Sequence, residues 1–269
     1  MKHTPILLFF LIITGIAGRA QNYYEQGLKA YRNDSSEMIS IVQLFTKAIE
    51  NSQEPAKSYM YRGYVRGLIG QFSMAEKDLN MSFQLDSTSY MIYRYYGKLY
   101  IEEQDYPTAL RYFDKAISLD GKQAVLYDER SGVKALMNDL QGSIADASRS
   151  ILLDSTDSDP YITRGFVQYE LKNYADALKD LGRSIVLEPG HKGYADRGAV
   201  YYELKEYQRS IDDFTHALSF FATDYEVLYR RALAYKALGM QEKACADLKK
   251  SKELGYAPAG EELGKHPCN

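Results

Sequence analysis

The chain of 269 residues has no tryptophan, two cysteines and no basic stretch, and its net charge is −3. Two cysteines exclude a disulfide-dense scaffold and a zinc site with four cysteine ligands. The lack of a basic surface argues against nucleic-acid binding, because lysine and arginine have to neutralise the phosphate backbone. Tyrosine, by contrast, is abundant, with 25 residues.

The first twenty residues have the pattern of a secretory signal peptide. Lys2 gives a positive start, an apolar run extends from Ile6 to Ile16, and Gly18 and Ala20 are the small residues before a cleavage site. We expect residues 1–20 to be removed and the protein to be periplasmic or extracellular. An uncleaved N-terminal anchor is the alternative. No later apolar run has the length of about 20 residues that spans a bilayer, so we expect no transmembrane segment in the mature chain.

Beyond residue 20 the sequence repeats with a period of 33 or 34 residues, after a first period of 36. One small residue marks each period, and we call this position the Gly column: Gly27, Gly63, Gly97, Ser131, Gly165, Gly198 and Ala232. From Gly63 onward, Ala or Ser follows the column after twelve and again after nineteen residues. Tyrosine precedes it by four residues in six of the seven periods. Repetition at this length is typical of solenoid proteins.

The spacing inside each period is helical. Ala177, Leu181 and Ser184 follow one another by four and three residues, as one face of a helix does. Pro55, Pro160 and Pro189 lie at junctions between periods, where they interrupt no helix. Each period therefore predicts two helices joined by a short turn, and the fold class is all-α.

These features resemble the tetratricopeptide repeat (TPR). In the fifth period the matching residues are Tyr161, Gly165, Tyr174, Ala177, Leu181 and Pro189. The resemblance implies a right-handed superhelical solenoid of seven helix-turn-helix units over residues 21–256. A short capping helix and tail are expected over residues 257–269. The chain departs from the family pattern in having Tyr in place of the consensus Trp, and in an irregular first unit.

No motif for catalysis or cofactor binding is present in the sequence. The four histidines are scattered, and there is no HExxH, no CxxC and no phosphate-binding loop followed by lysine. We therefore expect no enzymatic activity, no cofactor and no metal.

The resemblance implies a protein–protein interaction scaffold that binds a peptide or protein segment in the concave groove. The alternative is a structural component of an envelope-associated assembly that uses its edges or convex face. TPR domains that clamp a C-terminal carboxylate carry Asn two residues before the Gly column. Here that position holds Glu25, Tyr61, Tyr95, Glu129, Thr163, Asp196 and Arg230, which argues against this type of recognition.

In TPR domains the first helix of each unit lines the groove, with residues three before, one after, and four to five after the Gly column facing inward. The fifth unit is thereby assigned Ile162, Phe166, Glu170 and Leu171. The positions of this set best suited to binding are Tyr24, Tyr31, Arg32, Tyr64, Arg94, Lys98, Phe166, Tyr202 and Tyr229. The hypothesis is that a segment with an acidic or C-terminal carboxylate group docks in the N-terminal half. The alternative is that these tyrosines pack against neighbouring first helices.

A charge pair also recurs. Arg precedes the Gly column by one residue and Asp follows that Arg by sixteen in five units: Arg62 and Asp78, Arg130 and Asp146, Arg164 and Asp180, Arg197 and Asp213, Arg231 and Asp247. The other two units lack both partners. Joint presence and joint absence predict an Arg–Asp contact inside each of the five hairpins.

The two cysteines are Cys245, in the last repeat, and Cys268, the penultimate residue. The ending resembles the terminal repeat of exported bacterial TPR proteins, and an exported chain can form disulfides. A Cys245–Cys268 disulfide is one reading. The other is a buried Cys245 that packs like Ala and a frayed Cys268.

Overall fold

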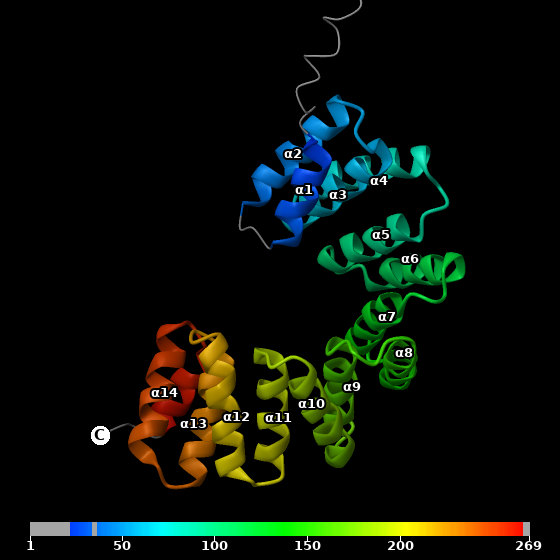
Figure 1. Cartoon of the computed structure of the whole chain (residues 1–269). Helices are drawn as coiled ribbons and strands as arrows, with labels where there is room; N and C mark the ends of the chain where they lie inside the picture. The colour runs from blue at the N-terminus through cyan, green and yellow to red at the C-terminus, as the bar shows by residue number, and fades with distance from the viewer. Residues whose placement is uncertain (1–21, 34–36, 266–269) are drawn as a thin grey trace, which may run out of the picture. The chain divides into compact units, whose positions relative to one another are not determined.

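The computed structural model describes residues 22–33 and 37–265, so the expected signal peptide lies outside the described residues. The chain forms two compact units, divided between Asp105 and Tyr106, and each is described by itself (Figure 1). In the described residues every regular element is a helix. The all-α class predicted from the repeat is confirmed.

The first unit contains α1 (Tyr23–Arg32), α2 (Met38–Glu50), α3 (Pro55–Leu68), α4 (Phe72–Leu85) and α5 (Tyr90–Glu102). The second begins with α6 (Tyr106–Leu119), α7 (Ala124–Leu136), α8 (Leu140–Leu153), α9 (Asp159–Glu170) and α10 (Tyr174–Leu187). It continues with α11 (His191–Glu203), α12 (Tyr207–Phe220), α13 (Tyr225–Ala237), α14 (Gln241–Glu253) and α15 (Ala257–Lys265).

Helices adjacent in sequence pack as hairpins, and each hairpin packs against the next one in its unit. The hairpins are α1–α2, α3–α4, α7–α8, α9–α10, α11–α12 and α13–α14. First helices also contact each other, since α9 packs against both α7 and α11. Figure 1 shows this row of helices from α9 to α14 in the second unit.

The core follows the repeated columns. The positions sixteen after the Gly column hold Leu79, Phe113, Leu181 and Phe214, all with no exposed surface. The small residues at the other two columns are buried as well, for example Ala177 and Ser184. Small side chains at these places let the two helices of a hairpin approach closely, while the large ones fill the space beside them.

The Gly column marks the closest approach. A Cβ added at Gly165 would lie 2.7 Å from Leu181 Cγ, and one added at Gly198 would lie 2.9 Å from the Phe214 ring. Such distances are shorter than carbon atoms tolerate. Glycine at these positions is therefore required by packing inside the hairpin.

From the second repeat onward, the turn between the two helices of a repeat contains one residue with positive φ, seven residues after the Gly column. It is glycine at Gly70 and Gly239, and a residue with a side chain elsewhere: Gln104 (59°), Asn138 (62°), Lys172 (61°) and Lys205 (60°). In the fifth unit the Lys172 amide donates to Tyr169 O and the Asn173 amide to Gln168 O, both at 2.8 Å. These bonds satisfy carbonyls at the end of the first helix, as in a Schellman motif.

The final helix, α15, covers the last hairpin. Its Ala259 is fully buried in a cluster with Ala232 of α13 and Leu248 of α14. Lys236 forms an ion pair with Glu262 on its edge. The predicted capping helix therefore shields apolar surface that another repeat would otherwise cover. None of the helices in the described part of the chain has the length and apolar character needed to cross a membrane.

Candidate functional site

Two adjoining cavities open between the first helices of the last three hairpins, α9, α11 and α13, and we call them together the C-terminal groove. The aromatic cavity, of about 200 Å³, is lined by Tyr169, Ala199, Tyr202, Glu203, Phe214, Glu226, Tyr229, Arg230, Leu233 and Tyr256. The charged cavity, of about 320 Å³, is lined by Phe166, Tyr169, Glu170, His191, Lys192, Ala195, Asp196, Ala199, Asp224, Glu226, Val227 and Arg230. Four residues line both, so the cavities are continuous.

The aromatic cavity is walled by tyrosines that are held by neighbouring rings. Tyr229 packs edge-on against Tyr256, the residue directly before α15, with ring centroids 5.3 Å apart. Tyr202 lies 5.5 Å from Tyr207 in the same manner. Partial burial raises the pKa of the hydroxyls of Tyr169, Tyr202 and Tyr229. These rings are half-buried, so they offer a fixed apolar surface with polar tips, which is the character of binding anchors.

The charged cavity contains one ion pair and one close contact between a histidine and a carboxylate. Arg230 Nη2 lies 2.7 Å from Glu226 Oε1, and the guanidinium interacts electrostatically with the Tyr169 side chain. His191 Nε2 lies 3.0 Å from Asp224 Oδ2. Arg230 lines both cavities, and Glu226 and Tyr169 are the side chains that position its guanidinium.

Asp196 is different, because its carboxylate has no hydrogen bond and no ion pair among the residues that the structure describes. Burial raises the pKa of Asp196 to about 6, although Arg230 and Lys192 act in the opposite direction. A carboxyl group with this pKa is ionised at neutral pH in an environment that disfavours the charge.

Asp128 on α7 shows the same effect more strongly. Burial, with the charges of Asp159, Asp157 and Glu129, raises its pKa to about 7, and Lys192 opposes the shift. Its Oδ1 is buried and accepts no hydrogen bond within the described ranges. Carboxylates thus gather along the first helices of the second unit.

In the first unit, the predicted groove tyrosines pack on one another. Tyr31 lies 5.9 Å from Tyr64, and Tyr64 lies 4.7 Å from Tyr95, measured between ring centroids. Tyr24 and Tyr64 are buried. This is the packing that the sequence left open as the alternative to a ligand site.

The basic residues of that half stand beside these rings. Lys98 Nζ lies 4.8 Å from the centroid of the Tyr64 ring, and the Arg94 guanidinium lies 5.8 Å from that of Tyr95. Both cations are half-buried, while Arg32 is exposed. Arg32 and Tyr24 line a cavity of about 190 Å³ in the first unit, which Lys57 also borders.

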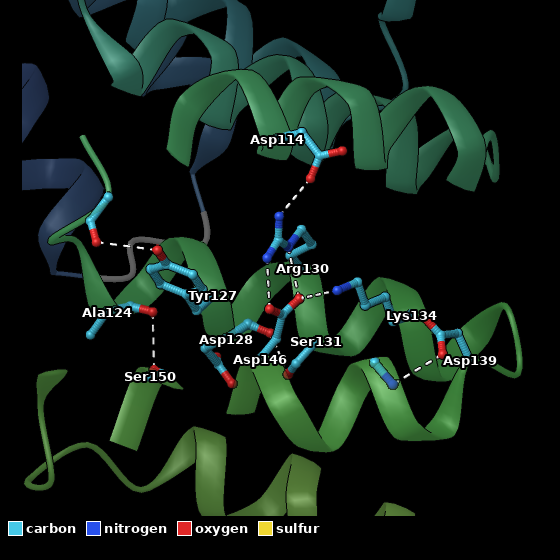
Figure 2. Close-up of polar contacts among 12 residues, drawn as sticks. Asp114, Ala124, Tyr127, Asp128, Arg130, Ser131, Lys134, Asp139, Asp146 and Ser150 are labelled. Carbon is cyan, nitrogen blue, oxygen red and sulfur yellow. Dashed lines mark hydrogen bonds and ion pairs between the residues drawn. The ribbon is translucent and has the colours of Figure 1, made fainter. Parts of the chain in front are cut away.

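The structure brings the five Arg–Asp pairs together, each joined by two hydrogen bonds of 2.7–2.9 Å from Nε and Nη2. The five carboxylates are buried. In four pairs the remaining Nη1 donates to the second helix of the preceding repeat, as Arg164 does to Ser148 Oγ at 2.9 Å. Figure 2 shows Arg130 between Asp114 of α6 and Asp146 of α8, with Lys134 on the other side of Asp146. Four of the arginines thus join the two helices of their own hairpin and also bind the preceding repeat. The sequence predicted only the contact within the hairpin.

Cys245 is buried in α14 and is disulfide-bonded. Its predicted partner, Cys268, lies outside the described residues. The pairing of these two cysteines stays a prediction.

Of the predicted groove residues, Phe166, Tyr202 and Tyr229 line the C-terminal groove. Sequence reasoning missed Tyr169, although the four-residue offset that gives Tyr202 after Gly198 gives Tyr169 after Gly165. It also noted Asp196 and Arg230 only because they are not Asn. Both residues lie two positions before the Gly column, in the sixth and the seventh repeat. An acidic and a basic residue at the same position of adjacent repeats was the signal that the sequence offered.

No group of three or more His, Cys, Asp or Glu side chains suited to a metal ion occurs in the part of the chain that is described. The groove therefore has anchoring and charged groups, and no constellation for metal chemistry in the described residues.

A family model described as tetratricopeptide repeat matches residues 226–253. Hsp70-Hsp90 organizing protein 2 of Arabidopsis thaliana is 23% identical over 162 residues, which are 60% of this chain and 27% of that protein. Among solved structures, a tetratricopeptide repeat protein from Parabacteroides merdae has a TM-score of 0.65 at 16% identity, covering 91% of this chain and 98% of the other. YrrB, described as a TPR protein with an unusual peptide-binding site, has a TM-score of 0.51 at 18% identity, covering 74% of this chain and 97% of YrrB.

The repeat period, the stacked hairpins and these matches support a tetratricopeptide-repeat protein. The chain spans about a quarter of the length of the curated relatives it matches. The family and the fold are typically those of non-catalytic protein-interaction modules.

Proposed function

We propose that this protein is a non-catalytic scaffold that binds a peptide or protein segment in the C-terminal groove. The observation that carries the proposal is the pair of continuous cavities on α9, α11 and α13, walled by half-buried tyrosines. Concave surfaces with aromatic walls and a few fixed polar groups are the usual form of binding sites. The description of YrrB as a protein with a peptide-binding site supports the same use of the fold.

The test is quantitative capture of partners by the purified protein from the extracellular or envelope fraction, read out by mass spectrometry. The parent is compared with Tyr202→Ala and Tyr229→Ala. The control is Phe220→Ala, which removes an aromatic ring that is 54% exposed and lines neither cavity. Circular dichroism verifies that the variants fold.

We expect both tyrosine variants to lose a partner that the parent and Phe220→Ala retain. Truncating an anchor of this kind weakens binding by about 2 kcal/mol, or about thirtyfold. If instead Phe220→Ala loses the partner and the tyrosine variants keep it, the groove is not the site. The structural role through edges or the convex face then takes its place.

A second candidate site is the cavity beside Tyr24 and Arg32 in the first unit. Its basic residues fit the hypothesis of a segment with an acidic or carboxylate group. Replacing Tyr24, Arg32 and Lys57, which line this cavity, singly and measuring affinity at two salt concentrations tests it. If all three variants fold and bind as the parent does, this half is not a binding site.

We also propose that the protein acts outside the cytoplasm, as the pattern of residues 1–20 indicates. Intact mass measurement of the protein from the envelope or extracellular fraction tests this, with loss of residues 1–20 expected. A chain that retains these residues and stays in the cytoplasm contradicts it.

A further inference from the structure

Acidic side chains dominate the C-terminal groove. Five carboxylates line the two cavities against two cationic side chains, Lys192 and Arg230. Two of these carboxylates already have partners: Glu226 pairs with Arg230, and Asp224 accepts hydrogen bonds from the amides of Glu226 and Val227. The remaining three, on Glu170, Asp196 and Glu203, form no ion pair in the part of the chain that the structure describes.

The negative charge continues from the groove towards α7. The exposed Lys192 on α11 interacts electrostatically with Asp196, Asp159 and Asp128, so one cation serves several carboxylates. Asp128 has a buried oxygen that accepts no hydrogen bond within residues 22–33 and 37–265. Desolvated carboxylates without partners are unfavourable, and a donor from outside the chain relieves this.

We infer that the groove selects a basic segment: a Lys or Arg side chain of the partner binds Asp196 in the charged cavity, and an adjacent apolar or aromatic side chain enters the aromatic cavity. The inference rests on the proposed function. The two cavities share Tyr169, Ala199, Glu226 and Arg230, so neighbouring side chains of one extended segment reach both. An acidic segment would meet three unpaired carboxylates and be repelled.

The immobilised full chain is panned against a phage-displayed library of random dodecapeptides. Enriched peptides are synthesised, and their Kd is measured by fluorescence anisotropy at two salt concentrations. The variants are Asp196→Asn, which keeps the shape and removes the charge, and Tyr229→Ala. The matched control is Asp212→Asn, which removes the same charge from an exposed residue of α12 outside both cavities.

We expect enriched peptides to combine Lys or Arg with an apolar residue and to bind more weakly at high salt. Asp196→Asn should weaken them at least about tenfold, since a hydrogen-bonded charge pair is lost. Asp212→Asn should leave Kd unchanged.

Acidic or neutral peptides that lose binding with Tyr229→Ala and keep it with Asp196→Asn overturn the basic selectivity and leave the groove as the site. Peptides indifferent to both variants, or no enrichment at all, overturn the proposed site and the selectivity with it.

Discussion

At the scale of single residues, the Arg–Asp pairs are the most regular device in the molecule. Asp180 is 5% exposed and accepts from Arg164 Nε and Nη2, while Arg164 also reaches Ser148 in the preceding repeat. Two parallel hydrogen bonds fix the angle between the paired helices more strictly than an apolar contact does. A buried pair is a weak contributor to net stability but a strong liability when one member is missing.

We predict that Asp180→Ala lowers the free energy of unfolding by about 3 kcal/mol, because the Arg164 guanidinium is left without its partner. Urea denaturation followed by circular dichroism measures the change. The double variant Arg164→Met/Asp180→Leu should recover most of the loss. Glu206→Ala, which breaks an exposed pair with Arg209, should change stability by less than about 1 kcal/mol. Equal losses for Asp180→Ala and Glu206→Ala would contradict a buried pair.

Asp196 makes a prediction about pH. Its pKa is raised from 3.8 to about 6 by burial, with Glu226 adding to the shift and Arg230 and Lys192 opposing it. Between these two values the folded chain binds more protons than the unfolded chain, so this group's contribution to stability falls as pH rises from about 4 to about 6. Above that window the ionised carboxylate destabilises the fold.

Asp196→Asn should therefore be more stable than the parent at pH 8, by roughly 1–3 kcal/mol, and equal to it near pH 4. Thermal or urea unfolding at several pH values measures the difference. Asp212→Asn, which removes the same charge from an exposed position of α12, is the control. A gap between Asp196→Asn and the parent that is the same at pH 4 and pH 8 would rule out the titration of Asp196 as its cause.

At the scale of the element, each of these turns places one residue in the left-handed region, which residues with a side chain disfavour. Lys172 and Lys205 have φ near 60°, where Gly239 stands in the last hairpin. A side chain in this region is strained by contact with its own backbone.

Lys172→Gly should stabilise the fold by about 0.5–1 kcal/mol by relieving this strain. Lys179→Gly is the matched control, because Lys179 is exposed in the interior of α10 and glycine there costs about 1 kcal/mol. Thermal denaturation of both variants measures the two shifts, which should have opposite signs. Shifts of the same sign would show that the turn residue carries no strain.

A second prediction at this scale concerns the close approach of the two helices inside a hairpin. At Gly165 an added Cβ meets Leu181 at 2.7 Å, whereas at Gly182 of α10 nothing lies within 4 Å. Gly165→Ala should destabilise by about 1–3 kcal/mol through overpacking, and Gly182→Ala should stabilise by about 0.5–1 kcal/mol through helix propensity. Denaturant midpoints of the two variants check this, and a neutral Gly165→Ala would mean that the helices can separate freely.

At the scale of the whole molecule, each hairpin contacts its neighbours in sequence within its own unit, so stability in each unit is shared along its row of repeats and depends on the ends of that row. The C-terminal end is covered by α15, and Cys245 of α14 is disulfide-bonded. The predicted pairing with Cys268 would join the last hairpin to the residues that follow the covering helix.

We predict that the unfolded, unreduced protein has no free thiol. Reduction should lower the free energy of unfolding by about 3 kcal/mol, the value for a loop of the length that a Cys245–Cys268 disulfide closes. Thiol labelling in denaturant gives the count. Cys245→Ala should unfold at the temperature of the reduced parent and respond no further to reductant. Two titratable thiols in the unreduced protein would exclude the Cys245–Cys268 pairing.

The sequence by itself determined the helical hairpin, its period and its buried columns. Close packing needs a small residue wherever two helices touch and a large one beside it. This requirement recurs in the sequence at the Gly column, as at Gly165, and sixteen residues after it, as at Leu181. The pairing of Arg164 with Asp180 could also be inferred, because both partners are present or absent together along one chain.

Only the tertiary structure decided where a groove opens. Tyr31 in the first unit and Tyr202 in the second both follow the Gly column by four residues, yet Tyr31 packs edge-on against the Tyr64 ring and Tyr202 lines a cavity. The difference depends on which side chains the adjoining first helices bring alongside, and these residues lie about one repeat away in the sequence. The unpaired state of Asp196 was hidden for the same reason, since its burial and its distance to Arg230 follow from packing between repeats and not from the spacing within one.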